Sequence, residues 1–251
     1  MSKRPLILVT NDDGIHAKGL RILSEIAKEF GDVVVVAPNK PQSGMGHAIT
    51  MTKPLRMNPD NLDGIEAWST SGTPVDCVKL AVYEIMHRKP DLVLSGINHG
   101  SNSSINVIYS GTMSAAVEGA VEGIKSIGFS LLSHHPDADF ETAKPYIVSI
   151  IKNVLQHPMP TGSCLNVNIP KGKLKGVKIC RQARGYWEDS FDVRKDPMGE
   201  NYYWLKGDFV NLDQGEDTDI WALANGYISV VPTQFDMTAH HAIANLNTWK
   251  I

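Results

Sequence analysis

The 251-residue sequence has few cysteines, little net charge and no long hydrophobic run. Its three cysteines, Cys77, Cys164 and Cys180, are odd in number and widely spaced, which argues against a disulfide framework or a zinc site and for reduced thiols in the cytoplasm. A formal net charge of −3 gives no basis for binding a nucleic-acid polymer or an anionic membrane. The apolar run after the basic N-terminus spans four residues, which predicts neither a signal peptide nor a membrane span.

Common phosphate-binding motifs are missing as well. Gly44 and Gly46 lack the third glycine and the immediate helix of a dinucleotide fingerprint, and no Walker-type loop is present. Repeats and low-complexity tracts are also absent. What is present is the composition of an ordinary globular protein, 42% hydrophobic and 20% charged, in a chain long enough to bury a sizeable core.

Buried strands alternate with helices over the first two thirds of the chain. The clearest strand is 6–10, a run of apolar and β-branched residues. Further strands are expected at 32–37, 91–97, 126–132 and 164–169, with shorter ones at 47–57 and 65–70. Helices are expected over 20–27, 74–87 and 140–156, and one from Met113 onward. This order predicts an α/β fold, a Rossmann-like doubly wound, mostly parallel sheet.

The C-terminal third has a different character. Aromatic residues are spread through a polar segment with a turn at 196–199, which predicts a projecting hairpin over 184–215. We expect a single domain, 1–251, with its core in 1–183 and 216–251. Aromatics on such a hairpin are typical of an oligomer contact, so a homo-oligomer, dimer or tetramer, is predicted; packing on the body is the alternative. A helix at 217–224, a strand at 227–231 and a helix at 240–249 complete the chain.

Oxygen-bearing side chains follow several of the predicted strands. They are Asn11, Asp12 and Asp13, then Ser43, then Asn98 and Asn102. In a parallel sheet these strand ends lie at one edge, where ligands bind. Adjacent carboxylates there suit a hard cation such as Mg²⁺ or Mn²⁺. The alternative is a plain turn, because Asn, Asp and Gly bond their own backbone.

Two segments have the features of helix starts. Residues 72–76 place Thr73 as N-cap, with a proline next and an acid at the third position. Ser110, Gly111 and Thr112 precede another helix, whose free N–H groups and dipole favour an anion. Plain capping by Ser110 and Thr112 is equally compatible. A cation site beside an anion site is the arrangement that phosphoryl chemistry requires.

In combination, these motifs resemble the SurE family of stationary-phase survival proteins. The matching segments are 11–15, Ser43, 72–78, 95–100 and 109–112. The resemblance covers nearly the whole chain and is strongest over 6–125. It implies a phosphomonoesterase with one divalent ion, Mg²⁺ or Mn²⁺, that hydrolyses nucleoside 5′-monophosphates. It also implies 3′-monophosphates and short polyphosphate as secondary substrates, and an oligomer built through the C-terminal part.

The resemblance also assigns roles to individual residues. Asp12, Asp13, Ser43 and Asn98 would be the metal ligands, with Asp12, Asp13 and Asn98 catalytic. The residues expected around the phosphate are Asn11, Asn102, Ser110, Gly111 and Thr112. The chain departs from the family at 103–106, where a glycine and acidic residues are usual, so loop shape and substrate contacts differ there. No stretch specifies a base, and we expect broad base tolerance.

Two other classes of protein fit the sequence less well than a metal-dependent phosphomonoesterase. A receiver-type signalling domain needs an acceptor Asp and a later Lys, whereas the matching strand ends carry Ser43 and Asn98. Aspartyl-nucleophile phosphatases separate their two acids by one residue; here the acids are adjacent, which favours direct attack by water. For His16 and His47 a surface or capping role is favoured over donation to phosphate, and His99 stays open. The pairs 134–135 and 240–241 have no partner spacing and are predicted to face solvent.

Overall fold

The computed structural model describes residues 4–135 and 138–249, and a nine-stranded sheet forms its centre. The strand order is β3-β4-β2-β1-β5-β6-β7-β11-β8. The parallel centre consists of β4 (Ile65–Thr70), β2 (Asp32–Pro38), β1 (Leu6–Thr10), β5 (Leu92–His99), β6 (Lys125–Leu131) and β7 (Ser163–Ile169). The edge strand β3 (Met57–Leu62) runs antiparallel to β4, and on the other side of the sheet β11 (Ile228–Gln234) runs antiparallel to β7. The short β8 (Val177–Ile179) pairs with β11.

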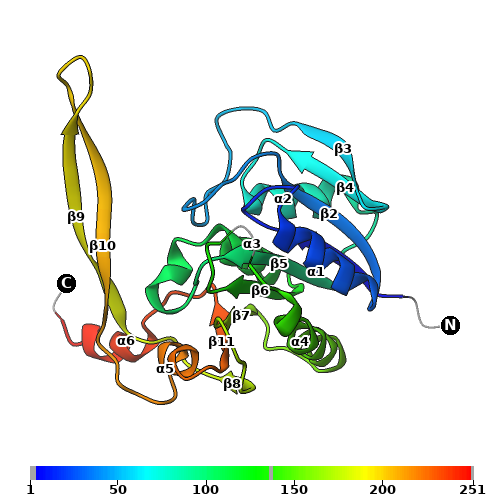
Figure 1. The fold of residues 1–251 in the computed structure, drawn as a ribbon. Helices are drawn as coiled ribbons and strands as arrows, with labels where there is room; N and C mark the ends of the chain where they lie inside the picture. Colours follow the sequence, from blue (N-terminus) through cyan, green and yellow to red (C-terminus); the bar gives the residue numbers. More distant parts are fainter. Residues whose placement is uncertain (1–3, 136–137, 250–251) are drawn as a thin grey trace.

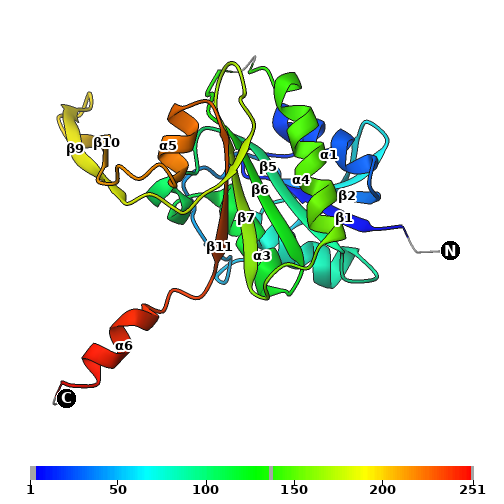
Figure 2. The ribbon, with the colours of Figure 1, turned by 90° about the horizontal axis from the view of Figure 1, so that it is seen from below.

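Helices cover both faces of this sheet (Figures 1 and 2). On one face, α1 (Lys18–Lys28) and α4 (Lys144–Gln156) pack on the larger core cluster. On the other, α2 (Pro74–Leu80) and α3 (Gly111–Val121) contribute to the second cluster. The central strands are therefore buried on both sides, which is why they consist of unbroken apolar runs. The predicted doubly wound, mostly parallel fold is confirmed.

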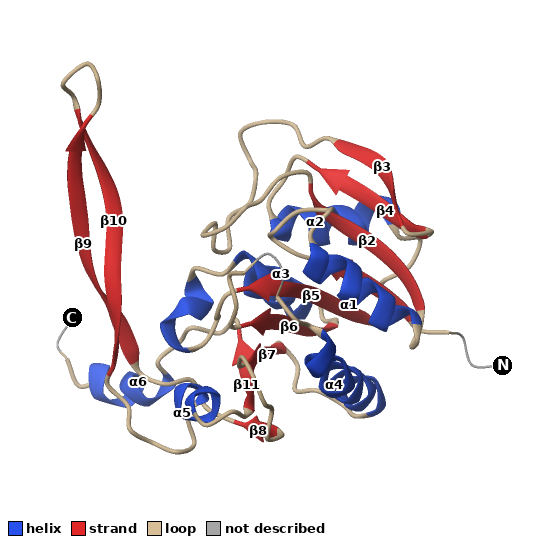
Figure 3. Ribbon diagram, viewed as in Figure 1, coloured by secondary structure: helices blue, strands red, loops and turns tan. Residues whose placement is uncertain are grey.

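A two-stranded antiparallel hairpin projects from the body (Figures 1 and 3). Its strands are β9 (Gly185–Lys195) and β10 (Asn201–Asn211), in register from the Gly185–Asn211 pair at the root to the Lys195–Asn201 pair near the tip. This confirms the predicted hairpin extension. After it come α5 (Asp219–Ala224), β11 and α6 (His240–Leu246). Figure 2 shows α6 extending away from the sheet, and none of its residues is buried.

Some predicted elements differ from the structure. The strand predicted over 47–57 does not form; β3 begins only at Met57. Polar groups of the 47–56 segment bond to α2 and α3 instead, and Pro54 has no N–H for a ladder. The three-residue β8 was not predicted, and α3 begins at Gly111 and not at Met113. Regular α-helix after Pro74 ends at Leu80 and continues as a wider turn over Ala81–Ile85.

A candidate active site at the carboxyl edge of the sheet

The turn after β1 is shaped by Asn11. Its amide nitrogen donates to the carbonyl oxygen of Gly14 at 3.0 Å, and its amide oxygen accepts from the Gly14 N–H at 3.2 Å. Gly14 has φ +102°, a conformation that L side chains rarely adopt. Asn11 thus acts as a turn former, which is the role that the sequence left open as the alternative to ligand binding. The turn it makes presents Asp12 and Asp13 at the strand end.

Asp12 is almost fully buried, with 5% of its surface exposed. Its Oδ1 accepts a short hydrogen bond, 2.5 Å, from the hydroxyl of Thr112 on α3. Burial raises the pKa of Asp12 to about 6, although the bond from Thr112 opposes the shift; the neighbouring Asp13 carboxylate adds to it. A carboxylate in this environment is poorly solvated and gains from a nearby positive charge.

The carboxylate of Asp13 is also poorly solvated. Its Oδ2 is buried and has no hydrogen-bond partner in the described part of the chain. Burial raises the pKa of Asp13, while the charges of His99 and His134 and the backbone N–H of His99 act in the opposite direction. Buried carboxylate oxygens are nearly always satisfied by a donor or a cation. The orphaned oxygen of Asp13 beside the desolvated Asp12 therefore fits a cation-binding role.

Asn98 reaches the same edge from β5. The β5–β6 register shifts between Ser95 and Asn98, and such irregularities re-aim side chains at strand ends. Gly96 has φ +124°, and a Cβ there would lie 2.4 Å from the carbonyl oxygen of Phe129, so only glycine fits this bend. The Asn98 amide nitrogen donates to the Gly100 carbonyl oxygen at 3.0 Å. That bond fixes the amide and leaves its oxygen for another partner.

Ser43 is an exposed residue of the loop that follows β2. The backbone N–H of Gln42 donates to the carbonyl oxygen of Asp12 at 2.8 Å, which joins this loop to the turn after β1. The N–H of Gly46 donates to the carbonyl oxygen of Tyr109 at 3.2 Å. The loop carrying Ser43 thus lies between the Asp12 turn and the segment that leads into α3.

The N-terminus of α3 abuts Asp12. Ser110 is its N-cap and accepts a hydrogen bond from the Met113 N–H at 3.0 Å. A Cβ on Gly111 would lie 2.7 Å from the Cβ of Asp12, so glycine is required for this close approach. Ser110 therefore caps the helix while Thr112 contacts the Asp12 carboxylate, and neither contact excludes an anion at this helix N-terminus.

Asn102 belongs to a buried amide network. Its side-chain nitrogen donates to the Ser130 hydroxyl at 2.7 Å, and its backbone N–H donates to the Asn168 side-chain oxygen at 2.8 Å. Asn166 donates to the Asn102 carbonyl oxygen, and Asn168 donates to Asn166. The last two residues lie on β7 and were not predicted as part of the site. The only sequence signal was two asparagines at alternate positions of an otherwise apolar strand, and it does not name their partner.

The loop that departs from the family pattern is held by the C-terminal part of the chain. The backbone N–H of Ser104 donates to the fully buried Asp219 at 2.8 Å, and the Ser104 hydroxyl donates to the Ala183 carbonyl oxygen. The indole N–H of Trp187, at the hairpin root, donates to Asn106 at 2.8 Å. This loop is therefore fixed by α5 and β9 rather than by acidic residues of its own.

The structure gives the exposure and the contacts of the histidines. His99 is half-buried; its Nδ1 lies 3.2 Å from the Ser133 carbonyl oxygen, and its ring meets that of Phe140 edge-on. His134 and His135 are exposed, as predicted. Three others face carboxylates: His16 with Asp60 at 3.9 Å, His47 with Glu118 at 2.9 Å and His240 with Asp236 at 2.7 Å. His240 is exposed as predicted, but the prediction that it has no partner was wrong.

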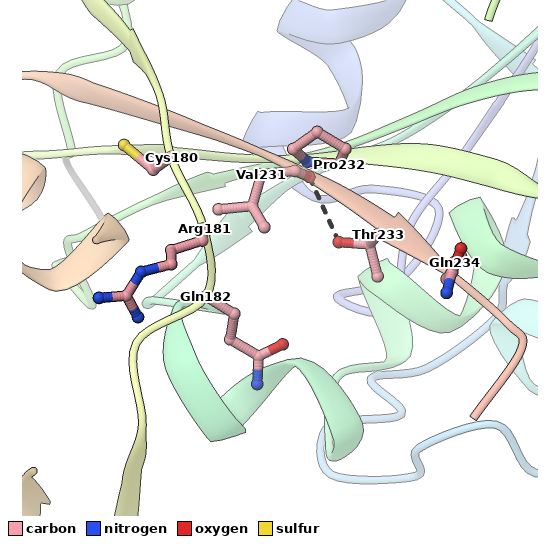
Figure 4. A pocket seen from close by; sticks show the side chains of 7 residues that line it. All are labelled: Cys180, Arg181, Gln182, Val231, Pro232, Thr233 and Gln234. Atoms are coloured by element: carbon pink, nitrogen blue, oxygen red, sulfur yellow. Dashed lines mark hydrogen bonds between the residues drawn. The ribbon is translucent and has the colours of Figure 1, made fainter. Parts of the chain in front are cut away.

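A cavity of about 460 Å³ lies elsewhere, between the segment after β8 and the end of β11 (Figure 4). Its lining includes Arg181, whose guanidinium is already paired with Asp213 and Asp217. Within the lining, the Thr233 hydroxyl donates back to the Val231 carbonyl oxygen. No free charge therefore faces the cavity from Arg181, and the candidate chemistry stays at the strand edge.

These features define the class of the molecule: a doubly wound α/β protein with a desolvated acidic pair beside a helix N-terminus. The family model described as "Survival protein SurE" matches residues 7–189. The chain belongs to the SurE family.

Individual relatives agree with this assignment. The chain is 64% identical to "5′-nucleotidase SurE" of Flavobacterium psychrophilum, over 100% of this chain and 99% of that protein. It is 60% identical to the protein of the same name from Christiangramia forsetii, over 99% and 98%. The crystal structure of the SurE protein from Aquifex aeolicus superposes with a TM-score of 0.84 at 39% identity, covering 97% of this chain and 99% of that one. Among the described residues, no helix combines the length and apolarity needed to cross a membrane.

Proposed function

We propose that this chain is a divalent-metal-dependent 5′-nucleotidase that hydrolyses nucleoside 5′-monophosphates to nucleoside and phosphate. Family membership and relatives named 5′-nucleotidase support a nucleotidase. The observation that carries the metal dependence is the buried Oδ2 of Asp13, which has no hydrogen-bond partner among the described residues, next to the desolvated Asp12. A divalent cation would compensate both carboxylates at once.

The residues at the edge fit such an ion. Asp12, Asp13, Ser43 and Asn98 would hold it, and all four offer the oxygen donors that Mg²⁺ and Mn²⁺ prefer. In the part of the chain that the structure describes, no three His, Cys, Asp or Glu side chains gather as a metal site. The proposed set therefore depends on neutral amide and hydroxyl oxygens beside the two carboxylates. When bound, the ion supplies Lewis-acid polarisation and lowers the pKa of a water molecule.

The protein's own groups bind and orient the phosphate. The first backbone N–H groups of α3, at Gly111 and Thr112, have no partner within the helix and suit phosphate oxygens. Thr112 holds the Asp12 carboxylate in one orientation, and Asn11 fixes the turn that presents it. Asn102 ties the loop after β5 to β6 and β7 through its amide network. Adjacent acids followed by glycine favour direct attack by water over a covalent aspartyl phosphate.

The substrate range that we propose comes from the resemblance to the SurE family, and the cellular setting from the cysteines. We expect nucleoside 3′-monophosphates and short polyphosphate as secondary substrates, and a base preference that is broad. The chain's three cysteines are free and buried, which supports action in the reducing cytoplasm. A homo-oligomer assembled through the hairpin completes the proposal.

Phosphate release from a nucleotide panel tests it. Protein stripped with a chelator should be inactive, and Mg²⁺ or Mn²⁺ should restore many turnovers per chain on nucleoside 5′-monophosphates. Full activity without metal would remove the metal site. Activity on sugar phosphates alone would overturn the nucleotide assignment, and uptake of a single phosphoryl group without turnover would indicate a receiver module.

A further inference from the structure

The loop that carries Ser43 is bound to two helices through side chains that the proposed chemistry does not use. Asp76, in the first turn of α2, accepts two hydrogen bonds from Thr50: from its N–H at 3.1 Å and from its hydroxyl at 2.6 Å. Thr73, the N-cap of α2, donates to the Ala48 carbonyl oxygen at 2.7 Å. The helix start at 72–76 therefore has a second role besides capping.

The cap and the loop share the same atoms. Thr73 Oγ1 accepts from the Asp76 N–H at 3.2 Å, and Asp76 Oδ2 accepts from the Thr73 N–H at 2.9 Å, which forms a complete capping box. The same Oδ2 takes the hydroxyl proton of Thr50. Residues 48 and 50 are thus bonded to the capping box of α2, and a movement of this part of the loop has to break a hydrogen bond to a buried carboxylate.

A second anchor comes from α3. The Glu118 side chain is 4% exposed, and its two oxygens accept from His47 Nε2 at 2.9 Å and from Lys79 Nζ at 2.5 Å. Burial opposes the charged form, but these two bonds hold the pKa of Glu118 below its ordinary value, so both contacts are charge-assisted. Helix α3 therefore contacts Asp12 through Thr112 at its N-terminus and the Ser43 loop through Glu118 two turns later.

Ser43 needs such anchors because its surroundings are intrinsically loose. It is exposed and followed by Gly44 and Gly46, both with positive φ, and a glycine-rich segment loses much conformational freedom when it is ordered. On its N-terminal side the Gln42 N–H bonds to Asp12. The anchors on its C-terminal side, at residues 46–50, complete the fixation.

We infer that Asp76 and Glu118 are positioning residues that hold residues 47–50 against α2 and α3 and thereby present Ser43 to the site at Asp12. The inference rests on the proposed function, because the role of Ser43 as a metal ligand belongs to it. It assigns the 72–76 segment a part in ligand binding. Pre-organising a ligand before the ion arrives improves affinity by reducing the ordering cost at binding.

The test changes only the loop side of each contact. His47→Ala/Thr50→Val removes the bond to Glu118 and the hydroxyl bond to Asp76, while the α2 capping box and the Lys79–Glu118 pair stay intact. Tyr83→Phe is the matched control, because it removes exposed bonds to Glu122 between the same two helical segments without touching the loop. His47→Gln is the rescue variant, since its amide can donate to Glu118.

Two readouts without substrate decide the outcome. Amide hydrogen exchange over residues 42–50 of the metal-free protein should be about tenfold faster in the double variant. The dissociation constant for Mn²⁺ alone, measured by titration calorimetry, should rise roughly five- to tenfold. Because the two substitutions lie in a surface loop, they should shift the melting midpoint by only about 2 °C. Tyr83→Phe should match the wild type, and His47→Gln should recover part of the loss.

Measurements of phosphate release distinguish a failure of this inference from a failure of the proposed function. At saturating Mn²⁺ the double variant should regain most of the wild-type kcat, because its defect is in ligand presentation. Unchanged loop exchange, or faster exchange with unchanged Mn²⁺ affinity, overturns the inference while wild-type nucleotidase activity stands. A wild type that releases no phosphate with Mn²⁺ overturns the proposed function, whatever the loop measurements give.

Discussion

Asp12 and Asp13 lie where a buried carboxylate charge destabilises the metal-free protein. A bound cation would compensate that charge. Replacing either by Asn keeps the shape but removes the charge. We expect each variant to lose about 10²- to 10³-fold in turnover or more, with an unchanged fold by circular dichroism. Phosphate release at saturating Mn²⁺ measures it. Near-normal turnover in either variant would reduce that residue to a turn former.

The buried state of Asp12 also predicts how stability depends on pH. Its pKa is about 6 in the folded protein against the ordinary value of 3.8 for an aspartate, so the native state holds more protons than the unfolded state between these values. Stability of the metal-free protein therefore falls as pH rises from about 4 to about 6, by up to roughly 3 kcal/mol. Below that window the effect is absent.

The melting temperature of the Asp12→Asn variant tests this dependence of stability on pH. Without metal the variant should melt higher than the wild type at pH 7.5, and the two should converge near pH 4, because Asn retains the acceptor for Thr112 and carries no charge. Mn²⁺ should raise the melting temperature of the wild type and have little effect on the variant. A variant less stable than the wild type at pH 7.5 would contradict the assigned cause.

Ser110 and Thr112 are two residues apart and have different tasks. Ser110→Ala removes an N-cap and should cost about 1 kcal/mol of unfolding free energy with little change in rate. Thr112→Val removes the bond to Asp12 and should reduce turnover more than stability. Measuring kcat and the unfolding free energy on both variants checks this. Equal profiles for the two would mean that Thr112 only supports the helix.

At the scale of elements, the central strands follow directly from the sequence. Runs such as 6–10 and 32–37 are apolar without interruption because helices cover both faces of the sheet. The strand predicted over 47–57 was wrong for a tertiary reason. Its alternating pattern is real, but the polar members bond to Asp76 and Glu118, which lie 26 and 71 residues away from their partners.

Contacts between residues far apart in the sequence also limit how much of the site is predictable. Residues that end a strand or begin a helix, such as Asp12, Asn98 and Thr112, are marked by local sequence, and the structure brings their elements together. Asn166 and Asn168 contact Asn102 across 64 and 66 residues, and no local pattern announces that pairing. Whether Asp12, Asp13, Ser43 and Asn98 bind metal stays a prediction for the experiments above.

At the scale of the whole molecule, the hairpin carries several large apolar side chains that are mostly exposed in the single chain. Phe191, Tyr203, Trp204 and Leu205 on the hairpin are each at least 60% exposed. Helix α6 has no buried residue, although it carries Ile243 and Leu246. Clustered exposed aromatics of this kind mark protein–protein contacts. The surface therefore favours assembly with further copies of the chain over a hairpin that folds back on its own body.

Light scattering on the intact protein should accordingly give a homo-oligomer, dimer or tetramer. Deleting residues 190–206 and joining Asp189 to Gly207, which pair in register, removes the exposed aromatic tip but keeps the Trp187 bond to Asn106. The shortened chain should be a smaller assembly, a monomer or insoluble. Because its root still braces the 103–106 loop, a soluble form that keeps nucleotidase activity would show that the tip serves assembly and the root serves the site. An intact chain that is a fully active monomer would contradict the assembly role of the hairpin.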